Sequence, residues 1–266
     1  IIRKKFRRKR TMVTWFDKKL CDAGFYINLD HRTDRKLLCE NELKISGFNG
    51  VERISGIKVD VDGFKEMGCT ETHLEIAKKQ IENNWDYVLY MEDDIESVYH
   101  YSYMIDQNNI DKIKVAHKII DDFNEFKPDV LWLGVRLEGE CEKISDVLLK
   151  PSKTSMSHAY VGSLKFAKYM VDHLRTREDG FFSRKWPIDF FISQTEIKTD
   201  WTIKAYESKD FLTNDIKIMV ACPLIFTQRE SYSDLTNRDT DYSLWVNQSF
   251  EEFANFNKFN ITPILK

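Results

Sequence analysis

The chain has 266 residues, of which 42% are hydrophobic and 13% aromatic, and its formal net charge is −3. This length provides for one large α/β domain with a substantial core, and the composition is that of an ordinary globular protein. Seven basic residues lie within residues 3–10, RKKFRRKR, so the rest of the chain is acidic. An acidic body excludes a broad basic face for nucleic acid, and we expect no nucleic-acid partner.

The N-terminal residues 1–20 are predicted to form a basic tail or linker. A basic cluster of this kind suits a solvated tail, a contact with an anionic membrane surface, or a connection to an additional domain. No apolar run in the sequence reaches the length of a membrane span, and no signal peptide is visible.

The five cysteines are scattered and form no C-x-x-C pair: Cys21, Cys39, Cys69, Cys141 and Cys222. This spacing argues against a structural zinc site and against a disulfide framework. We therefore expect a reducing compartment, either the cytoplasm of a cell or, for a viral protein, the virion or the host cytoplasm. The basic N-terminus leaves membrane association open.

From Gly24 onward, short apolar runs alternate with amphipathic segments. The apolar runs predict strands at 25–29, 51–60, 87–91, 130–134 and 218–226. Helical spacing predicts helices over 36–46, from Thr72 onward, from Ile113 to near Pro128, and over 164–174. Strands separated by helices predict a mixed, mostly parallel α/β sheet flanked by helices in a single domain.

Residues 21–248 are predicted to form this domain, because no proline- or glycine-rich linker interrupts them. The helix at Thr72 is expected to begin with a capping box, Thr72-x-x-Glu75. The remaining segment, 249–266, has phenylalanines at a spacing of three, which predicts a C-terminal aromatic helix that packs back on the body.

Three consecutive carboxylates, Glu92, Asp93 and Asp94, follow the strand predicted at 87–91. On an extended chain, residues two positions apart point to the same side, so Glu92 and Asp94 are expected to converge on one hard cation. Mn²⁺ or Mg²⁺, with a diphosphate and water completing the coordination, fits such a short acidic motif. The alternative is a solvated strand end or the first turn of a helix.

Other polar side chains are expected near the same edge of the sheet, where open α/β folds bind ligands. Arg32 and Arg35 beside Asp30 form either a salt-bridged surface turn or a contact for a diphosphate or uridine. His73 either caps its own helix or faces the site. Asp189 is a single charge inside an aromatic run, and if it is buried it requires a partner or a function.

Seven sequence blocks in order resemble glycosyltransferase family 25, which includes bacterial lipopolysaccharide β-galactosyltransferases and collagen hydroxylysine galactosyltransferases. The resemblance covers about residues 24–247 and rests on FYINLDHRTDR (25–35), GCTETHLEIAKK (68–79), DYVLYMEDDI (86–95), PDVLWLGVR (128–136), SHAYVGSLKFAKYMVDHL (157–174), PIDFFIS (187–193) and PLIFTQRESYSDL (223–235). It implies a GT-A fold and an inverting transfer of a hexose, most often galactose, from a UDP-sugar donor with help from Mn²⁺. The implied acceptor is a hydroxyl of a glycan or of a hydroxylysine-containing protein.

The resemblance also implies roles for individual residues. Asp94 would be the principal metal ligand, with Glu92 or Asp93 touching the metal shell or the donor ribose. Asn28, Asp30 and Arg32 match a first-strand motif beside the nucleotide, and His73 matches the family's GC..SH motif with threonine in place of serine.

The catalytic base is assigned from the same resemblance, together with the requirement that inversion removes a proton from the acceptor hydroxyl. Asp189, in the block PIDFF, is the proposed base, and Asp234, in the SD pair after the last strand, is its competitor. Trp132, Tyr160 and Trp186 are interpreted either as core residues or as platforms that stack on a sugar.

Two other classes of function remain open from the sequence. The first is a catalytically silent relative that binds a glycan or a protein, although the complete acidic motif and Asp189 argue against it. The second is a metal-dependent phosphoryl-transfer enzyme, which accounts for the carboxylates but not for the later blocks. Within the transferase reading, UDP-glucose and UDP-N-acetylglucosamine are alternative donors.

Overall fold

The structure is a computed structural model that describes residues 12–59, 66–98, 111–174, 188, 216–229, 231–232 and 239–240. The strands are β1 (Val13–Trp15), β2 (Lys18–Cys21), β3 (Ala23–Asn28), β4 (Phe48–Asn49), β5 (Val51–Ser55), β6 (Tyr87–Glu92), β7 (Ile95–Ser97), β8 (Val130–Lys143), β9 (Leu148–Ser163), β10 (Ile218–Ala221), β11 (Phe226–Gln228), β12 (Ser231–Tyr232) and β13 (Asp239–Thr240). The helices are α1 (Thr33–Ile45), α2 (Glu66–Asn83), α4 (Lys112–Phe126) and α5 (Leu164–His173).

A six-stranded mixed sheet with the order β10-β8-β9-β6-β3-β5 forms the centre of the molecule. Strands β5, β3 and β6 run parallel to one another, and β10 runs parallel to β8. Strand β9 is antiparallel to β6 and β8, and it also pairs antiparallel with β10. The prediction of a mixed, mostly parallel α/β sheet flanked by helices is therefore confirmed at this level.

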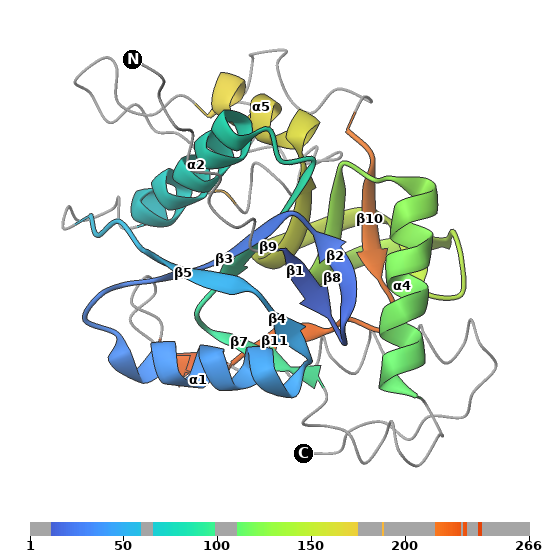
Figure 1. Ribbon diagram of the computed structural model, residues 1–266, viewed down its shortest axis with the longest axis horizontal. Coiled ribbons are helices and arrows are strands. Elements are labelled where there is room, and N and C mark those ends of the chain that lie inside the picture. The colour runs from blue at the N-terminus through green and yellow to red at the C-terminus, as the bar shows by residue number, and fades with distance from the viewer. Residues whose placement is uncertain are drawn as a thin grey trace, which may run out of the picture.

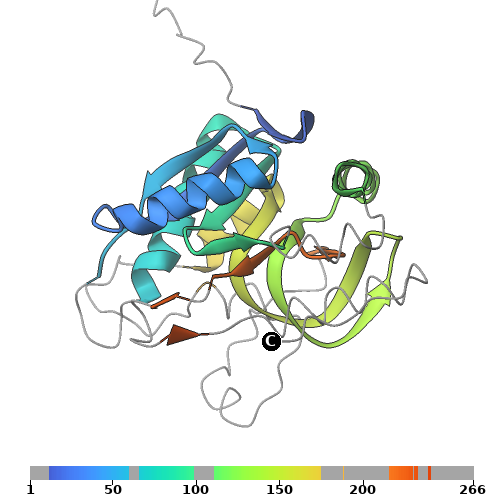
Figure 2. The ribbon, with the colours of Figure 1, turned by 90° about the horizontal axis from the view of Figure 1, so that it is seen from below.

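The helices cover both faces of this sheet. Helices α2 and α5 pack against each other on one side, and α1 lies on the opposite side, next to β7 and β11 (Figure 1). Helix α4 packs against β2. Seen from below, the long strands β8 and β9 curve together out of the sheet (Figure 2).

The core is aromatic where β6, β8 and β9 meet. The rings of Tyr90 and Tyr160 stack with centroids 4.8 Å apart, and Trp132 meets Tyr160 edge-on at 5.1 Å. All three side chains are wholly buried. The interpretation of Trp132 and Tyr160 as core residues is confirmed, because a buried ring offers no face to a sugar. Trp186 lies outside the described residues.

The late strand predicted at 218–226 is two strands that belong to different sheets. Strand β10 joins the large sheet, while β11 pairs with β7 in a separate two-stranded sheet. Pro223 lies between them and has no amide hydrogen to donate to a ladder, so the apolar run cannot continue as one strand.

The capping box predicted at Thr72 is wrong, because α2 begins six residues earlier, at Glu66. Thr72 therefore lies inside the helix. Its hydroxyl donates to the carbonyl oxygen of Gly68 at 2.8 Å and accepts from the backbone N–H of Ile57 at 2.9 Å. The side chain thus ties the loop after β5 to the helix instead of starting the helix.

The boundary predicted at residue 20 also needs correction. Residues 13–21 form the antiparallel pair β1–β2, and β1 pairs further with β4. The side chains of Val13 and Trp15 are wholly buried, and the Trp15 indole N–H donates to the carbonyl oxygen of Ser46 at 2.9 Å. The folded body therefore includes residues that were expected in the tail.

Several predicted features lie outside the described residues: the basic segment 3–10, most of the block 187–193, and the C-terminal segment 249–266 with its expected aromatic helix. Within the described ranges, no helix is long and apolar enough to cross a membrane.

Candidate functional site

The candidate site lies at the carboxyl ends of the neighbouring parallel strands β3 and β6, the edge of the sheet at which α/β folds bind ligands. Strand β3 ends at Asn28 and β6 ends at Glu92, and Ile27 is in register with Glu92. The chain turns immediately after Glu92, so Asp93 and Asp94 occupy a turn at this edge.

Asp93 is held by two partners from the β3 side of the site. The side-chain amide of Asn28 donates to Asp93 Oδ2 at 2.6 Å, and Arg35 donates to Asp93 Oδ1 at 3.1 Å. Burial raises the pKa of Asp93 above its usual value, and the neighbouring charge of Asp94 raises it further. Asn28 and Arg35 oppose this shift because both favour the ionised carboxylate.

Asp94 is also buried, and its two carboxylate oxygens differ in their surroundings. Gln228 donates to Asp94 Oδ2 at 3.0 Å, and the Arg35 guanidinium lies 3.5 Å from the same oxygen. Asp94 Oδ1 is buried without a hydrogen-bond partner among the described residues. Burial raises the pKa of Asp94, against the opposing charge of Arg35.

The sequence argument for convergence of Glu92 and Asp94 assumed an extended chain through both residues. Strand β6 ends at Glu92 and a turn follows, so the alternation of side chains does not extend to Asp94. The carboxylate of Asp94 meets Arg35 and Gln228, whereas that of Glu92 lies 3.8 Å from the Cys69 thiol.

Asn28 and Asp30 belong to one hydrogen-bonded group organised by Arg53, which the sequence reasoning missed. Arg53 Nε donates to Asn28 Oδ1 at 2.8 Å, and Arg53 Nη2 donates to the Asn28 carbonyl oxygen at 3.0 Å. Arg53 also pairs with Asp30, and Ser55 donates to Asp30 at 2.7 Å. These hydrogen bonds lower the pKa of Asp30. Arg53 lies on β5, and only its pairing with β3 brings it here.

Arg32 forms an ion pair with Asp34 at 2.9 Å, two residues along the chain. This interaction lowers the pKa of Asp34 to about 2. The backbone of Arg32 also contributes to the site, since its carbonyl oxygen accepts a hydrogen bond from the Asn28 amide at 3.0 Å. Arg35 lies 3.1 Å from Asp93 and 3.5 Å from Asp94, and the charge of Arg32 also opposes the rise in the pKa of Asp94.

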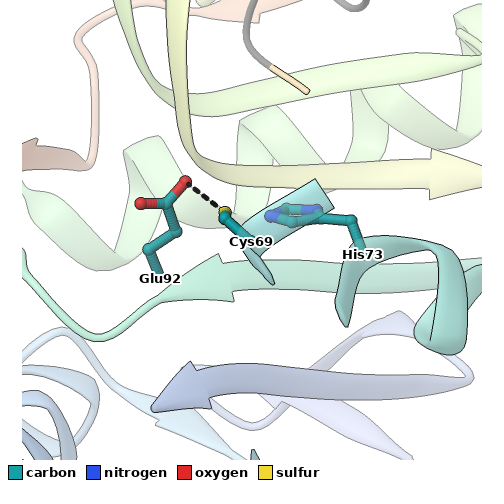
Figure 3. A group of neighbouring side chains, drawn as sticks. All are labelled: Cys69, His73 and Glu92. Carbon is teal, nitrogen blue, oxygen red and sulfur yellow. Dashed lines mark hydrogen bonds between the residues drawn. The ribbon is translucent and has the colours of Figure 1, made fainter. Parts of the chain in front are cut away.

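His73 is wholly buried, and its Nδ1 lies 2.8 Å from the Tyr160 hydroxyl. Its ring is parallel to those of Tyr90 and Tyr160. Burial lowers the pKa of His73 to about 3, so the imidazole is neutral near neutral pH. It lies beside Cys69 and Glu92 (Figure 3), on the α2 side of β6.

The sequence reasoning also missed a second group, Arg229 and Glu42, which holds the turn that contains Asp94. The backbone N–H of Arg229 donates to the Asp94 carbonyl oxygen at 2.6 Å, and the Arg229 guanidinium pairs with the buried Glu42. Glu42 also accepts from the Ser97 backbone N–H at 2.9 Å. The available signal was the polar pair Gln228–Arg229 directly after an apolar run, at the end of β11.

The two predicted catalytic bases, Asp189 and Asp234, lie outside the described residues, so their distances to the acidic pair are not part of this geometry. Comparison with known proteins finds no matching family model and no significant match among curated sequences.

The described site is chemically suited to hold a cation and a polar ligand. Two buried carboxylates, Asp93 and Asp94, share one guanidinium, that of Arg35, which leaves the three groups with an excess of negative charge when both acids are ionised. A hard divalent cation bonded to oxygen would remove this excess.

Proposed function

We propose that the chain is an inverting glycosyltransferase of the GT-A type that transfers a hexose from a UDP-sugar to a hydroxyl group. We assign galactose as the hexose, because it is the sugar that the resemblance implies. The acceptor is a glycan or a hydroxylysine-containing protein, and the cofactor is Mn²⁺ or Mg²⁺. The proposal joins the resemblance to glycosyltransferase family 25 with the acidic group at the ends of β3 and β6.

One observation carries the metal-binding part of the proposal: Asp94 Oδ1 is buried and has no hydrogen-bond partner within the part of the chain that the structure describes. A buried acceptor without a partner is costly, and carboxylate oxygens are the ligands that Mn²⁺ and Mg²⁺ prefer. Burial also raises the pKa of Asp94, although Arg35 and Gln228 favour its charged form. Asp94 is therefore the principal proposed ligand.

A divalent cation, when bound, would supply the positive charge that stabilises the departing diphosphate. The chain's own residues orient the ligands around it. Arg35 and Asn28 hold Asp93 beside Asp94, and Arg53 holds Asn28 and Asp30 in the place that we assign to the donor nucleotide. Glu92 faces Cys69, so we assign it a supporting role.

The transfer itself requires a base on the acceptor side. The acceptor hydroxyl oxygen attacks the anomeric carbon while the bond from that carbon to the UDP oxygen breaks, and the hydroxyl proton passes to a carboxylate. We propose Asp189 for this role, with Asp234 as the competing assignment.

The binding step is tested by the melting temperature of the full chain with UDP and Mn²⁺. We expect the two together to raise the melting temperature, because a ligand that binds only the folded state stabilises it. Asp94→Asn keeps the side-chain shape and should abolish the gain. Asp121→Asn, at an exposed carboxylate on α4, removes the same charge elsewhere and should retain it. No shift in the wild-type chain, or equal shifts in the two variants, would contradict the proposal.

A further inference from the structure

We propose that Cys69, His73 and Glu92 form a zinc site, separate from the Asp93–Asp94 pair. Of the three residues, Glu92 alone also has a supporting role in the transferase proposal. The three side chains come from two elements that pack together, α2 and β6. Cys69 and His73 are four residues apart on α2, a spacing that places both side chains on one face of the helix. Glu92 is the last residue of β6.

The three ligand atoms already lie close together. One atom from each residue lies within 4.8 Å of the others, and Cys69 Sγ is 3.8 Å from Glu92 Oε1. Around a tetrahedral zinc ion, bonds of about 2.3 Å to sulfur and about 2.0 Å to oxygen place these two atoms roughly 3.5 Å apart. Small side-chain movements are enough to bring the group to that geometry.

An independent observation at His73 also points to a ligand. The residue is wholly buried, its Nδ1 lies 2.8 Å from the Tyr160 hydroxyl, and its Nε2 has no hydrogen-bond partner in the described ranges of the chain. Figure 3 shows the far end of the imidazole ring directed at Cys69. An unpaired nitrogen sealed in the interior is costly unless something occupies the position next to it.

The Tyr160 hydroxyl is placed to support the tautomer that metal binding requires. When it donates to Met170 Sδ, 4.0 Å away, its oxygen accepts from His73 Nδ1–H, and the zinc proposal assigns this arrangement. Nε2 then carries the free lone pair. Metal-bound histidines ordinarily donate their other N–H to an oxygen in this way.

The ligand types select the metal. A thiolate and an imidazole favour zinc over Mn²⁺ or Mg²⁺, which take oxygen ligands. Three protein ligands leave a fourth position, and the partial exposure of Cys69 and Glu92 gives that position a route to solvent. Asp94 faces Arg35 and Gln228 and takes no part in this group.

The test is a titration of the whole, metal-stripped chain with Co²⁺, a spectroscopic substitute for Zn²⁺. We expect one equivalent to give a sulfur-to-cobalt charge-transfer band that Zn²⁺ displaces. Cys69→Ser should remove the band and weaken binding by at least about tenfold. Cys141→Ser, at a cysteine of similar partial exposure, is the matched control and should behave as the wild type.

Two further variants separate this site from the proposed donor site and from general damage to the fold. Glu92→Gln should keep the charge-transfer band but weaken Co²⁺ binding, because the thiolate remains and one oxygen ligand is lost. Asp94→Asn should give the same charge-transfer band as the wild type, whatever its effect on UDP binding. Absence of a saturable charge-transfer band, or equal bands in Cys69→Ser and Cys141→Ser, would overturn the zinc site.

Discussion

Asp93 and Asp94 are neighbouring buried acids, and the Arg35 guanidinium forms an ion pair with each of them. Burial raises the pKa of both carboxyls, and Arg35 opposes that shift. Their environment explains why a substitution at Arg35 should act more strongly than one at Arg32, which pairs with the exposed Asp34. The difference between the two arginines should appear in the free energy of unfolding of the two variants.

We predict that Arg35→Gln lowers the free energy of unfolding by roughly 3 kcal/mol at pH 7, because it leaves two buried carboxylates without their cation. The loss should shrink at pH 5. The folded-state pKa values of Asp93 and Asp94 are raised, so as the pH falls toward them the native state binds more protons than the unfolded state. Protonation then removes the cost of burying the two charges. Urea unfolding at both pH values measures this, with Arg32→Gln expected to cost less than about 1 kcal/mol. A pH-independent loss at Arg35 would contradict the account.

The two buried histidines, His73 and His158, make stability depend on pH in the direction opposite to that of the buried carboxyls. Burial lowers the pKa of His73 to about 3 and of His158 to about 4, so both are neutral in the folded chain above these values. Between pH 6.5 and 4 the unfolded state binds more protons, and their contribution to stability falls as the pH falls.

We predict that His158→Gln reduces the slope of unfolding free energy against pH in this window by up to about 1.4 kcal/mol per pH unit, the value for one proton. Chemical denaturation at half-unit intervals of pH gives the slope. An unchanged slope in the variant would show that His158 does not titrate as its burial requires.

At the scale of elements, the apolar runs located β3, β5, β6 and β8, and helical spacing located α1, α4 and α5. Strand β9 was missed because it is a long antiparallel strand that begins in a polar stretch, Leu148–Ser157, and the strand–helix alternation predicts mostly parallel neighbours. The start of α2 was misplaced because Thr72 and Glu75 have the sequence of a cap. Thr72 instead bonds to Gly68 inside the helix and to Ile57 in the loop after β5, and the local sequence does not reveal the contact with the loop.

Gly68 tests the packing that brings Cys69 and His73 to the site. A Cβ atom there would lie 2.0 Å from the Ile57 carbonyl oxygen, so the loop after β5 can cross α2 only at a glycine. Helix propensity alone favours alanine by about 1 kcal/mol. We predict that the steric clash with Ile57 outweighs the gain in helix propensity. Gly68→Ala should therefore lower the free energy of unfolding by about 1–3 kcal/mol.

Equilibrium unfolding in urea measures the effect of Gly68→Ala. Glu75→Ala, at an exposed position of the same helix, is the control and should change stability by less than about 0.5 kcal/mol. A stabilised Gly68→Ala variant would mean that the loop moves away without cost.

At the scale of the whole molecule, the sequence located the acidic residues at a strand end but not their partners. Arg53, Gln228 and Arg229 reach the site only because β5 pairs with β3 and β11 pairs with β7. The Cys69–His73–Glu92 group was missed for a related reason. The sequence argument considered pairs of cysteines, whereas this group combines one residue each of Cys, His and Glu. Side chains from separate elements become neighbours only through the sheet order, which the apolar pattern does not encode.

The most direct test of the central claim is UDP release by the purified chain, measured with Mn²⁺ over a panel of UDP-sugars that includes galactose, glucose and N-acetylglucosamine donors. We predict UDP release above background with at least one donor, strongest with UDP-galactose, a dependence on Mn²⁺, and a loss of about 100-fold or more in Asp94→Asn, the scale expected when one electrostatic contact to the transition state is removed. Asp121→Asn should retain wild-type activity. Release of inorganic phosphate in place of UDP, background release with every donor, or full activity in Asp94→Asn would contradict the account.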